Sequence, residues 1–197
     1  MKLSDPLTLT DELVQLVPLS HDHRVDLTEA ADDGQLWRHW YTAVPKPENV
    51  TAEINRRLAL QDAGSMNPFA IIDAKTGKAV GMTTFMNIDE VQNRVEIGST
   101  WYRQSVQRTG FNTHCKYLML RQAFENWNCI AVEFRTHFFN RQSRTAIERL
   151  GAKLDGILRN HSRTADGAFR DTCVYSILPH EWPTVKAHLT YQMKRVR

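Results

Sequence analysis

The chain has 197 residues, of which 42% are hydrophobic and 24% are charged; this is the composition of a globular domain and excludes a fibrous or low-complexity chain. Its net charge of +3 is too small to indicate a nucleic-acid-binding protein by itself. The three cysteines form no CxxC pair, and the sequence has neither a secretory signal nor an apolar run of about 20 residues. We therefore expect a cytoplasmic protein that does not span a membrane and needs no disulfides.

The first third of the chain predicts a strand region followed by two helices. Residues 7–20 alternate well enough for a strand or a hairpin, and residues 21–40 are typical of a helix that breaks near Gly34. Residues 49–64 predict a second helix that ends at Gly64. Its apolar side chains share one face: Val50, Ile54, Leu58 and Ala59.

The rest of the chain predicts a sheet with further helices. Residues 67–88 predict two strands around a KTGK turn, and residues 93–102 predict a third strand. The remaining predicted elements are a helix at 112–127, a strand at 129–138, a helix at 141–151, strands at 153–160 and 171–178, and a helix at 180–195. This order predicts an α+β fold in one domain, with one sheet covered by helices.

The stretch QRTGFN connects a predicted strand to a predicted helix. Helix N-termini present unpaired amides and a partial positive charge, so phosphate groups bind there. Gly110 can adopt a positive φ, and Asn112 is a preferred N-cap residue. Further hydrogen-bond donors are supplied by Gln107, Arg108 and Thr113. The turn predicts either a phosphate site or a simple capped connection.

Four segments carry a family resemblance, in order along the chain. VEIGSTWY is similar to a splayed central strand, and QRTGFN to a Gln/Arg-x-x-Gly-x-Gly/Ala signature, with Asn112 in place of the small residue and Arg108 where glycine is common. NRQSRTAIERLGAK is similar to an Asn-x-x-Ser helix with a Leu-Gly turn, and the last segment, residues 156–178, to a closing hairpin. Together they resemble the GNAT superfamily of N-acetyltransferases, in particular the branch of the ribosomal-protein alanine N-acetyltransferases.

The resemblance implies a GNAT-like mixed sheet of about seven strands, splayed at its centre and flanked by helices. Residues 1–66 would form the N-terminal strand and the acceptor-side helices, residues 67–180 the sheet and the acetyl-CoA-binding core, and residues 181–197 the C-terminal helix. Acetyl-CoA would be the co-substrate, with no metal ion. The residues implied to bind it are Trp101, Tyr102, Gln107, Arg108, Thr109, Gly110, Asn112, Thr113 and Asn140.

Amine acetylation needs a neutral amine, a donor for the oxyanion and help for the departing thiolate. The resemblance implies a backbone amide near Trp101 or Tyr102 as the oxyanion donor, and Ser143 near the sulfur; Ser143 could also cap its helix. Glu96 is a candidate base if it points inward, where burial would raise its pKa; alternatively it is exposed and paired with an arginine. The other candidates for the base are Glu133, His161 and water.

The acceptor would be a protein N-terminus or an amino-bearing small molecule. At pH 7 roughly a tenth of an α-amine is already neutral, whereas a lysine amine needs about 3.5 kcal/mol more to lose its proton. A site without a strong base therefore favours acceptors of low pKa. Two other functions stay open, a non-catalytic acyl-CoA-binding module and a nucleic-acid-associated protein. A homodimer is also possible, because dimers are common among proteins of this family.

Several other residues have two readings. His21 and His23 form an HxH pair, but no third ligand follows, so we expect surface histidines and not a metal site. The aromatic residues Trp37, Trp40 and Tyr41 could line an acceptor pocket or pack helices onto the sheet. Cys115 is expected to be a core residue, because direct acetyl transfer needs no thiol nucleophile.

Overall fold

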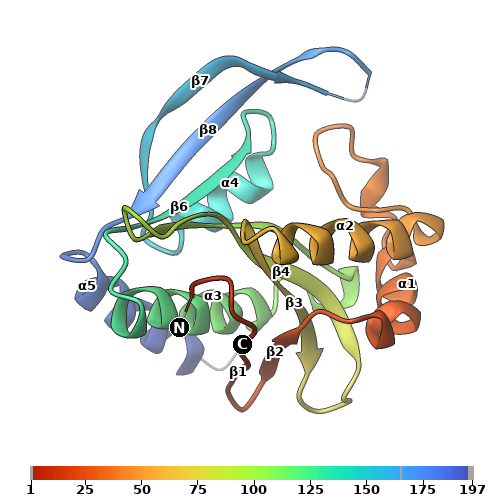
Figure 1. Ribbon diagram of the computed structural model, residues 1–197, viewed down its shortest axis with the longest axis horizontal. Coiled ribbons are helices and arrows are strands. Elements are labelled where there is room, and N and C mark those ends of the chain that lie inside the picture. Colours follow the sequence, from red (N-terminus) through yellow and green to blue (C-terminus); the bar gives the residue numbers. More distant parts are fainter. Residues whose placement is uncertain (1, 165, 195–197) are drawn as a thin grey trace.

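The computed structural model describes residues 2–164 and 166–194, and one eight-stranded sheet forms its centre (Figure 1). The strands lie in the order β1-β2-β3-β4-β5-β6-β8-β7. Neighbouring strands are antiparallel, except that β5 and β6 are parallel. The bounds are β1 Leu9–Thr10, β2 Val14–Pro18, β3 Met66–Asp73, β4 Ala79–Asp89, β5 Arg94–Tyr102, β6 Ala131–His137, β7 Lys153–Arg163 and β8 Phe169–Ile177.

Helices cover both faces of the sheet (Figure 1). α1 and α2 pack on one face, and α3, α4 and α5 on the other. The bounds are α1 Arg24–Asp32, α2 Val50–Asp62, α3 Phe111–Arg121, α4 Arg141–Glu148 and α5 Trp182–Lys194. A π-helical turn, Gln122–Asn126, extends α3. We name the two faces after α2 and α3.

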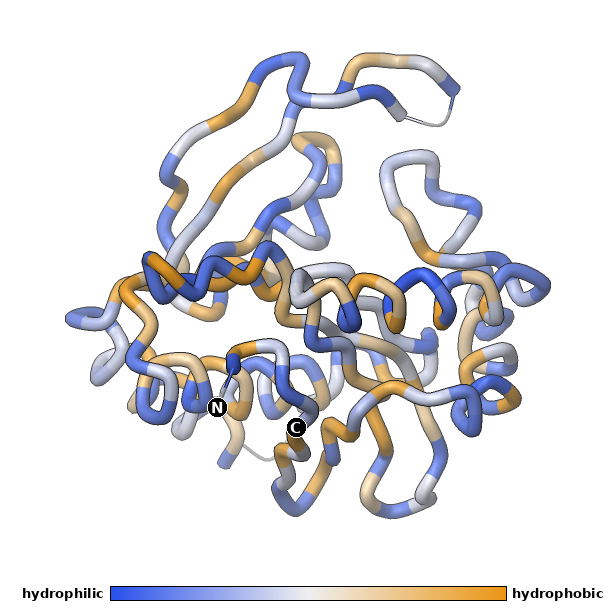
Figure 2. The backbone as a smooth tube through the Cα atoms, in the orientation of Figure 1, coloured by the Kyte–Doolittle hydropathy of each residue, from blue (hydrophilic) through white to orange (hydrophobic). Residues whose placement is uncertain are grey.

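Each face has its own hydrophobic core. On the α3 face, Phe85, Leu118 and Trp127 belong to a large cluster of buried side chains. On the α2 face, Leu27 and Ile54 pack with other buried residues in a smaller cluster. Hydrophobic segments are concentrated in the central strands and the helices, and the turns are hydrophilic (Figure 2). Alternation along the strands therefore sends apolar side chains to both faces, as a sheet between two helical layers requires.

The sheet splays where β5 leaves β6. The two strands pair in parallel only over Arg94–Glu96 and Ala131–Glu133. Beyond this point the register between β4 and β5 shifts between Met82 and Thr84, and Ser99 has a φ of 47°. An extra residue in one strand is a β-bulge, which bends the strand and increases its twist. From Gly98 to its end, β5 therefore pairs with β4 alone and has an open edge.

The structure confirms the mixed α+β fold with a splayed sheet and differs in three details. Residues 7–20 contain both β1 and β2, so the sheet has eight strands and not about seven. The helix expected over residues 21–40 ends at Asp32, because Gly34 and Gln35 both have positive φ angles. α3 begins at Phe111, one residue before the expected start.

Candidate active site

The open edge of β5 carries a backbone amide that faces away from β4. Hydrogen bonds alternate along an antiparallel pair, and the Arg103 amide donates to the Val80 carbonyl at 2.8 Å. Alternation then directs the Trp101 amide at β4 and the Tyr102 amide at the open side, over the stretch where Gly81 and Met82 pair regularly with Tyr102 and Trp101. An oxyanion donor was expected at the amide of Trp101 or Tyr102. Because the Trp101 amide faces β4, the Tyr102 amide is the candidate of the two.

The turn between β5 and α3 differs from the expectation in two respects. Gly110 is the N-cap residue of α3 and has an ordinary φ of −71°, whereas Arg108 has a φ of 60°. Asn112 is not the N-cap residue, because it lies inside the first helical turn. The family position that commonly holds glycine is thus the one that is left-handed here, which is the conformation that glycine adopts most readily.

The first helical turn leaves its amides available to a ligand. The first intrahelical bond joins the His114 amide to the Gly110 carbonyl at 3.0 Å, so the amides of residues 111–113 precede it. The Phe111 amide has a long bond of 3.4 Å to the Thr109 hydroxyl. Thr113 is buried beneath this turn. An anion over the turn would meet converging N–H groups and the positive end of the α3 dipole.

Two side chains connect this turn with the open edge of β5. Gln107 Nε2 donates to the Tyr102 carbonyl at 3.1 Å, and its Oε1 accepts from Gln142 Nε2 of α4 at 3.3 Å. The Tyr102 hydroxyl donates to Asn112 Oδ1 at 3.2 Å. The turn before α3, the splayed strand and α4 are therefore tied together by Gln107, Tyr102 and Asn112, which were predicted to bind the cofactor, and by Gln142, which was not.

The N-terminus of α4 also faces this region. Asn140 Oδ1 accepts from the Ser143 amide at 3.0 Å, so Asn140 and not Ser143 caps the helix. The Ser143 hydroxyl makes no hydrogen bond to any of the residues that the structure describes. The capping alternative for Ser143 is thus wrong, and its hydroxyl is available for another partner.

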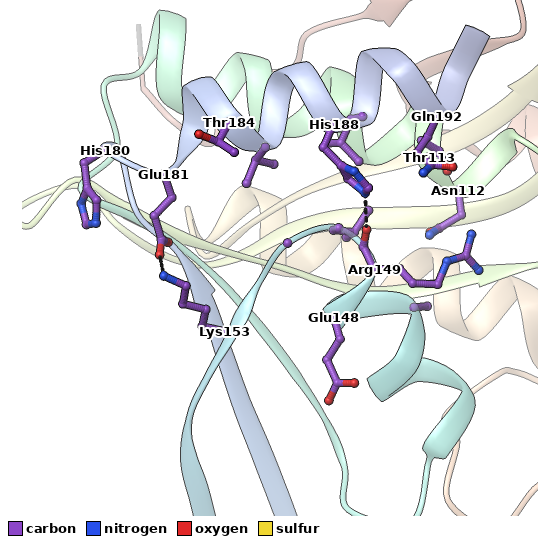
Figure 3. A pocket seen from close by; sticks show the side chains of 15 residues that line it. Asn112, Thr113, Glu148, Arg149, Lys153, His180, Glu181, Thr184, His188 and Gln192 are labelled. Atoms are coloured by element: carbon purple, nitrogen blue, oxygen red, sulfur yellow. Dashed lines mark hydrogen bonds and ion pairs between the residues drawn. The ribbon is translucent and has the colours of Figure 1, made fainter. Parts of the chain in front are cut away.

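A cavity of about 710 Å³ adjoins the first turn of α3 (Figure 3). It lies between the start of α3, the end of α4 and the α5 helix, with Asn112 and Thr113 at one end. Lys153 and Glu181 form an ion pair of 2.6 Å in its wall. A cavity of this size suits a nucleotide-sized ligand, since small-molecule sites are typically about 300–1,000 Å³.

Arg149 is a residue of this cavity that the sequence analysis missed. Its side chain extends from the end of α4 toward Asn112 (Figure 3). The Arg149 carbonyl is bonded to His188 Nε2 of α5 at 3.1 Å. The signal available in the sequence was its place directly before the Leu150-Gly151 turn, but only the packing of α4 against α5 directs it to the turn before α3.

Two carboxylates lie on the α2 face where the sheet splays. Glu96 is 5% exposed, accepts from Asn87 Nδ2 at 2.7 Å and lies 3.5 Å from Arg135 Nε. Burial raises the pKa of the Glu96 carboxyl, and the opposing effects of Asn87 and Arg135 are smaller. Glu133 forms ion pairs with both Arg94 and Arg135. The alternative of an exposed Glu96 is therefore wrong, although Arg135 does approach it.

The Glu96 carboxylate also lies close to the open edge. A methyl group on Gly98 would lie 3.0 Å from Glu96 Oε1, which places this oxygen over the strand where it leaves β6. His161, the third candidate, is on β7 and its Nδ1 bonds the Thr172 hydroxyl at 3.1 Å. Glu96 and Glu133 are both buried at this place, but Glu133 is held in ion pairs with two arginines, which leaves Glu96 as the stronger candidate for the base.

An aromatic cluster joins the α1–α2 loop to the end of β6. Trp40 is 55% exposed, and its ring centroid lies 4.9 Å from that of His137 and 6.0 Å from that of Phe139. Trp40 therefore contacts the end of β6 and the turn after it, and the pocket-lining alternative for this residue stays a prediction. Tyr41 lies beside it, and Trp37 contacts Lys46.

His137 was not singled out in the sequence. It is 2% exposed, and its Nδ1 lies 3.1 Å from the Phe139 amide, which donates to it. Burial lowers the pKa of His137, and Arg170 lowers it further, so the neutral ring carries its proton on Nε2. Nε2 has no hydrogen-bond partner among the described residues. Arg170 also acts electrostatically on Glu96, so these groups share one side of the sheet.

The remaining candidates have structural roles. Cys115 is fully buried, and burial raises the pKa of its thiol to about 12, as expected of a core residue. His23 Nδ1 accepts from the Ser20 amide at 3.1 Å. Within residues 2–164 and 166–194, no three histidine, cysteine or acidic side chains gather as metal ligands would. In the same ranges, no helix has the length and apolar character for crossing a bilayer.

The chain is similar to known acetyltransferases. Residues 14–153 match the family described as the acetyltransferase (GNAT) domain. An uncharacterised N-acetyltransferase, p20 of Bacillus licheniformis, is 27% identical over 142 residues, which span 72% of this chain and 77% of p20. A second relative is YdaF of Bacillus subtilis, whose name describes it as a proposed ribosomal N-acetyltransferase. It is 29% identical over 106 residues, which span 54% of this chain and 57% of YdaF.

Solved structures agree with this assignment. The structure of a GCN5-related N-acetyltransferase from Brucella melitensis superposes with a TM-score of 0.85 at 25% identity, covering 96% of this chain and 86% of that one. Mycobacterium smegmatis RimJ, solved with CoA-disulfide, has the same fold, with a TM-score of 0.82 at 20% identity and coverage of 98% and 97%. With its splayed sheet and a family match over more than half of its length, the chain belongs to the GNAT family of acetyltransferases.

Proposed function

We propose that this protein transfers the acetyl group of acetyl-CoA to a primary amine, by direct attack of the amine within a ternary complex. The observation that carries the proposal is the convergence of two ligand-binding edges at one place. The open edge of β5 and the first turn of α3 meet at residues 100–113, where Gln107 and Tyr102 tie them together. We expect the protein to act in the cytoplasm.

The acetyl-CoA site would use residues from β5, α3 and α4. The amides of residues 111–113 and the Arg108 side chain would bind the diphosphate. The adjoining cavity, with Arg149, would take the nucleotide end. The pantetheine arm would pair with the open edge of β5, and the Asn140 amide group would donate to it, since its oxygen already caps α4. Trp101 supports this strand from the α2-face core.

The reaction would proceed by addition and elimination. The amine nitrogen attacks the thioester carbon, and an outward amide of β5 donates to the oxyanion. The C–S bond then breaks, the new amide bond remains, and the CoA thiolate leaves with Ser143 as its hydrogen-bond donor. Glu96 accepts the proton that the amine loses, either directly or through water; burial raises the pKa of this carboxyl, which makes it a stronger base than an exposed glutamate.

The acceptor would approach from the α2 face. Glu96 lies there, beside Arg170 and the cluster of Trp40, His137 and Phe139. A protein N-terminal α-amine or an amino-bearing small molecule has a lower pKa than lysine and needs less help to become neutral. We therefore expect α-amines to be better acceptors than lysine side chains.

The test is turnover with matched acceptors. Peptides with a free N-terminus, the same peptides blocked at the N-terminus but carrying lysine, and small amino compounds would be incubated with acetyl-CoA. Release of free CoA thiol would be followed, and mass spectrometry would locate the acetyl group. We expect turnover with free α-amines and little with blocked peptides.

Other results would contradict the proposal. Calorimetric heat with acetyl-CoA, but no thiol release with any amine, would instead indicate an acyl-CoA-binding module. If acetyl-CoA gave no calorimetric heat and no turnover, the acetyl-CoA site itself would be contradicted. Binding to nucleic acid that falls steeply with salt would favour a nucleic-acid-associated protein.

A further inference from the structure

A buried arginine holds the bulge of β5 from the α2 face. Arg57 of α2 is 1% exposed, and each of its three nitrogens has a partner. Nε donates to Glu53 Oε1 at 2.7 Å, Nη1 to the Thr84 hydroxyl at 2.7 Å, and Nη2 to the Ser99 carbonyl at 2.8 Å. Ser99 is the residue with positive φ, so Arg57 bonds directly to the distorted peptide.

A buried lysine holds the same bulge from the α3 face. Lys116 is 5% exposed, and its Nζ donates to the Thr83 hydroxyl at 3.0 Å and to the Thr100 hydroxyl at 2.7 Å. The two hydroxyls also lie 2.8 Å from each other. Burial lowers the pKa of the Lys116 amine to about 8. The two cations therefore contact adjacent residues in both strands, Thr83–Thr84 and Ser99–Thr100, from opposite sides.

These contacts need an explanation other than stability. Removing a cation from water is costly, and Lys116 bonds only to hydroxyls, without a carboxylate. A positive φ at Ser99 adds strain. The bulge decides which way the next amides of β5 point, and those of Trp101 and Tyr102 follow it immediately.

We propose that Arg57 and Lys116 are positioning residues that clamp the β5 bulge from both faces and so aim the Tyr102 amide, which follows the bulge, at the acyl donor. The inference rests on the proposed function and deepens it. Neither side chain would touch the reacting atoms. Both would act through the backbone of residues 99–102, which must be held closely for an oxyanion donor to work.

The test compares Arg57→Met and Lys116→Met with Arg56→Met. Arg56 is a matched control, because it also pairs with Glu53, at 2.8 Å, but does not contact the bulge. We expect each clamp variant to lower kcat by at least about tenfold, with the dissociation constant for CoA changed by less than about threefold, since the diphosphate turn is intact. A purely structural role would instead lower the melting temperature and leave kcat per folded molecule unchanged.

Two milder variants test the proposal if Arg57→Met or Lys116→Met does not fold. Thr100→Val removes one of the two hydroxyls that Lys116 binds, the one on the bulge itself, and Arg57→Lys retains the charge but not the three-way contact. A kcat within about twofold of the Arg56→Met value in the folded clamp variants would overturn the proposal.

Hydrogen exchange separates this inference from the proposed function. If the wild-type protein acetylates no amine, the proposed function fails, but exchange at residues 98–102 still tests the clamp. Faster exchange there in the clamp variants than in Arg56→Met supports it, and equal exchange overturns it.

Discussion

Glu96 and Glu133 lie directly opposite each other in the last register pair before β5 and β6 separate. Arg135 Nη2 is 2.9 Å from Glu133 Oε2, and Arg135 Nε is 3.5 Å from Glu96 Oε2. Glu133 also has Arg94, whereas Glu96 has only the Asn87 amide as a second close partner. The negative charge of Glu133 is thus balanced by two arginines at close range, whereas that of Glu96 is balanced less well. Burial accordingly raises the pKa of Glu96.

Glu96→Gln is expected to lower activity while raising stability at neutral pH. Loss of a general base typically costs about 100-fold or more in kcat. Below about pH 4.5, the ordinary value for glutamate, Glu96 is protonated in both the folded and the unfolded chain. As the pH rises toward the raised folded pKa, the unfolded chain releases its proton first, so the wild-type protein loses stability that the glutamine variant keeps.

Chemical denaturation at several pH values would measure this difference. The stability advantage of Glu96→Gln should be largest near pH 7 and disappear toward pH 4.5. Glu133→Gln is the matched control and should be destabilising at pH 7, because it leaves Arg94 and Arg135 without their carboxylate. Equal stability changes in the two variants would contradict our assignment of Glu96.

Arg149→Ala is expected to weaken acetyl-CoA binding without changing the chemical step. Its guanidinium points to the turn before α3, where a charge-assisted bond to a phosphate is expected. Losing one such bond should raise the KM for acetyl-CoA about tenfold and leave kcat nearly unchanged. Steady-state kinetics at fixed salt would measure it. Arg24→Ala removes the same charge from α1, on the other face, and should leave both constants unchanged.

Arg108 allows backbone strain to be separated from charge. Its φ of 60° is costly for any residue with a Cβ atom, so Arg108→Gly should be more stable than Arg108→Ala by about 1 kcal/mol. Both variants lack the guanidinium and should raise the KM for acetyl-CoA equally. Urea denaturation gives the first comparison. If alanine proves the more stable variant, the left-handed conformation at this position is wrong.

Gly81→Ala is expected to disrupt the pairing of β4 with β5. A Cβ at Gly81 would lie 2.1 Å from the Trp101 carbonyl oxygen, which no side-chain movement can relieve because that oxygen belongs to the backbone. We expect a loss of about 3 kcal/mol in the free energy of unfolding, measured by denaturation. Gly156→Ala should be close to neutral, since nothing lies within 4 Å of a Cβ there. Similar losses in both variants would argue against the close approach.

Local patterns predicted most of the elements. The helix over residues 112–127 was predicted from apolar residues at helical spacing; α3 and the π-helical turn form most of it, and Leu120 and Trp127 are buried as expected. The end of α1 and the cap of α3 were predicted less well. Gly110 was chosen for its conformational freedom, but tertiary packing assigned the left-handed position to Arg108, and no propensity would have selected an arginine there. The division of residues 1–197 into functional segments stays a prediction.

Buried charged residues were the main omission. Arg57 lies seven residues after Val50 and three after Ile54, on the face of α2 that was predicted to be apolar, whereas Arg56 lies off that face and has 48% of its side chain exposed. Lys116 likewise lies four residues before Leu120, on the buried side of α3. The helical period therefore indicated that both side chains point inward, but not which residues they bind, because those partners come from distant strands.

The sequence by itself determined the order of the elements, the family and the two segments at which we propose that the acyl donor binds. Residues 107–113 and 140–143 are short segments, and their cap and turn geometry depends on neighbours a few residues away. Only the tertiary structure decided the rest of the site, which includes the burial of Glu96, the contact between Trp40 and His137, and the two cations on the β5 bulge. These features join residues that are far apart in the chain, so they exist only once the helices have packed on a sheet that is already twisted and splayed.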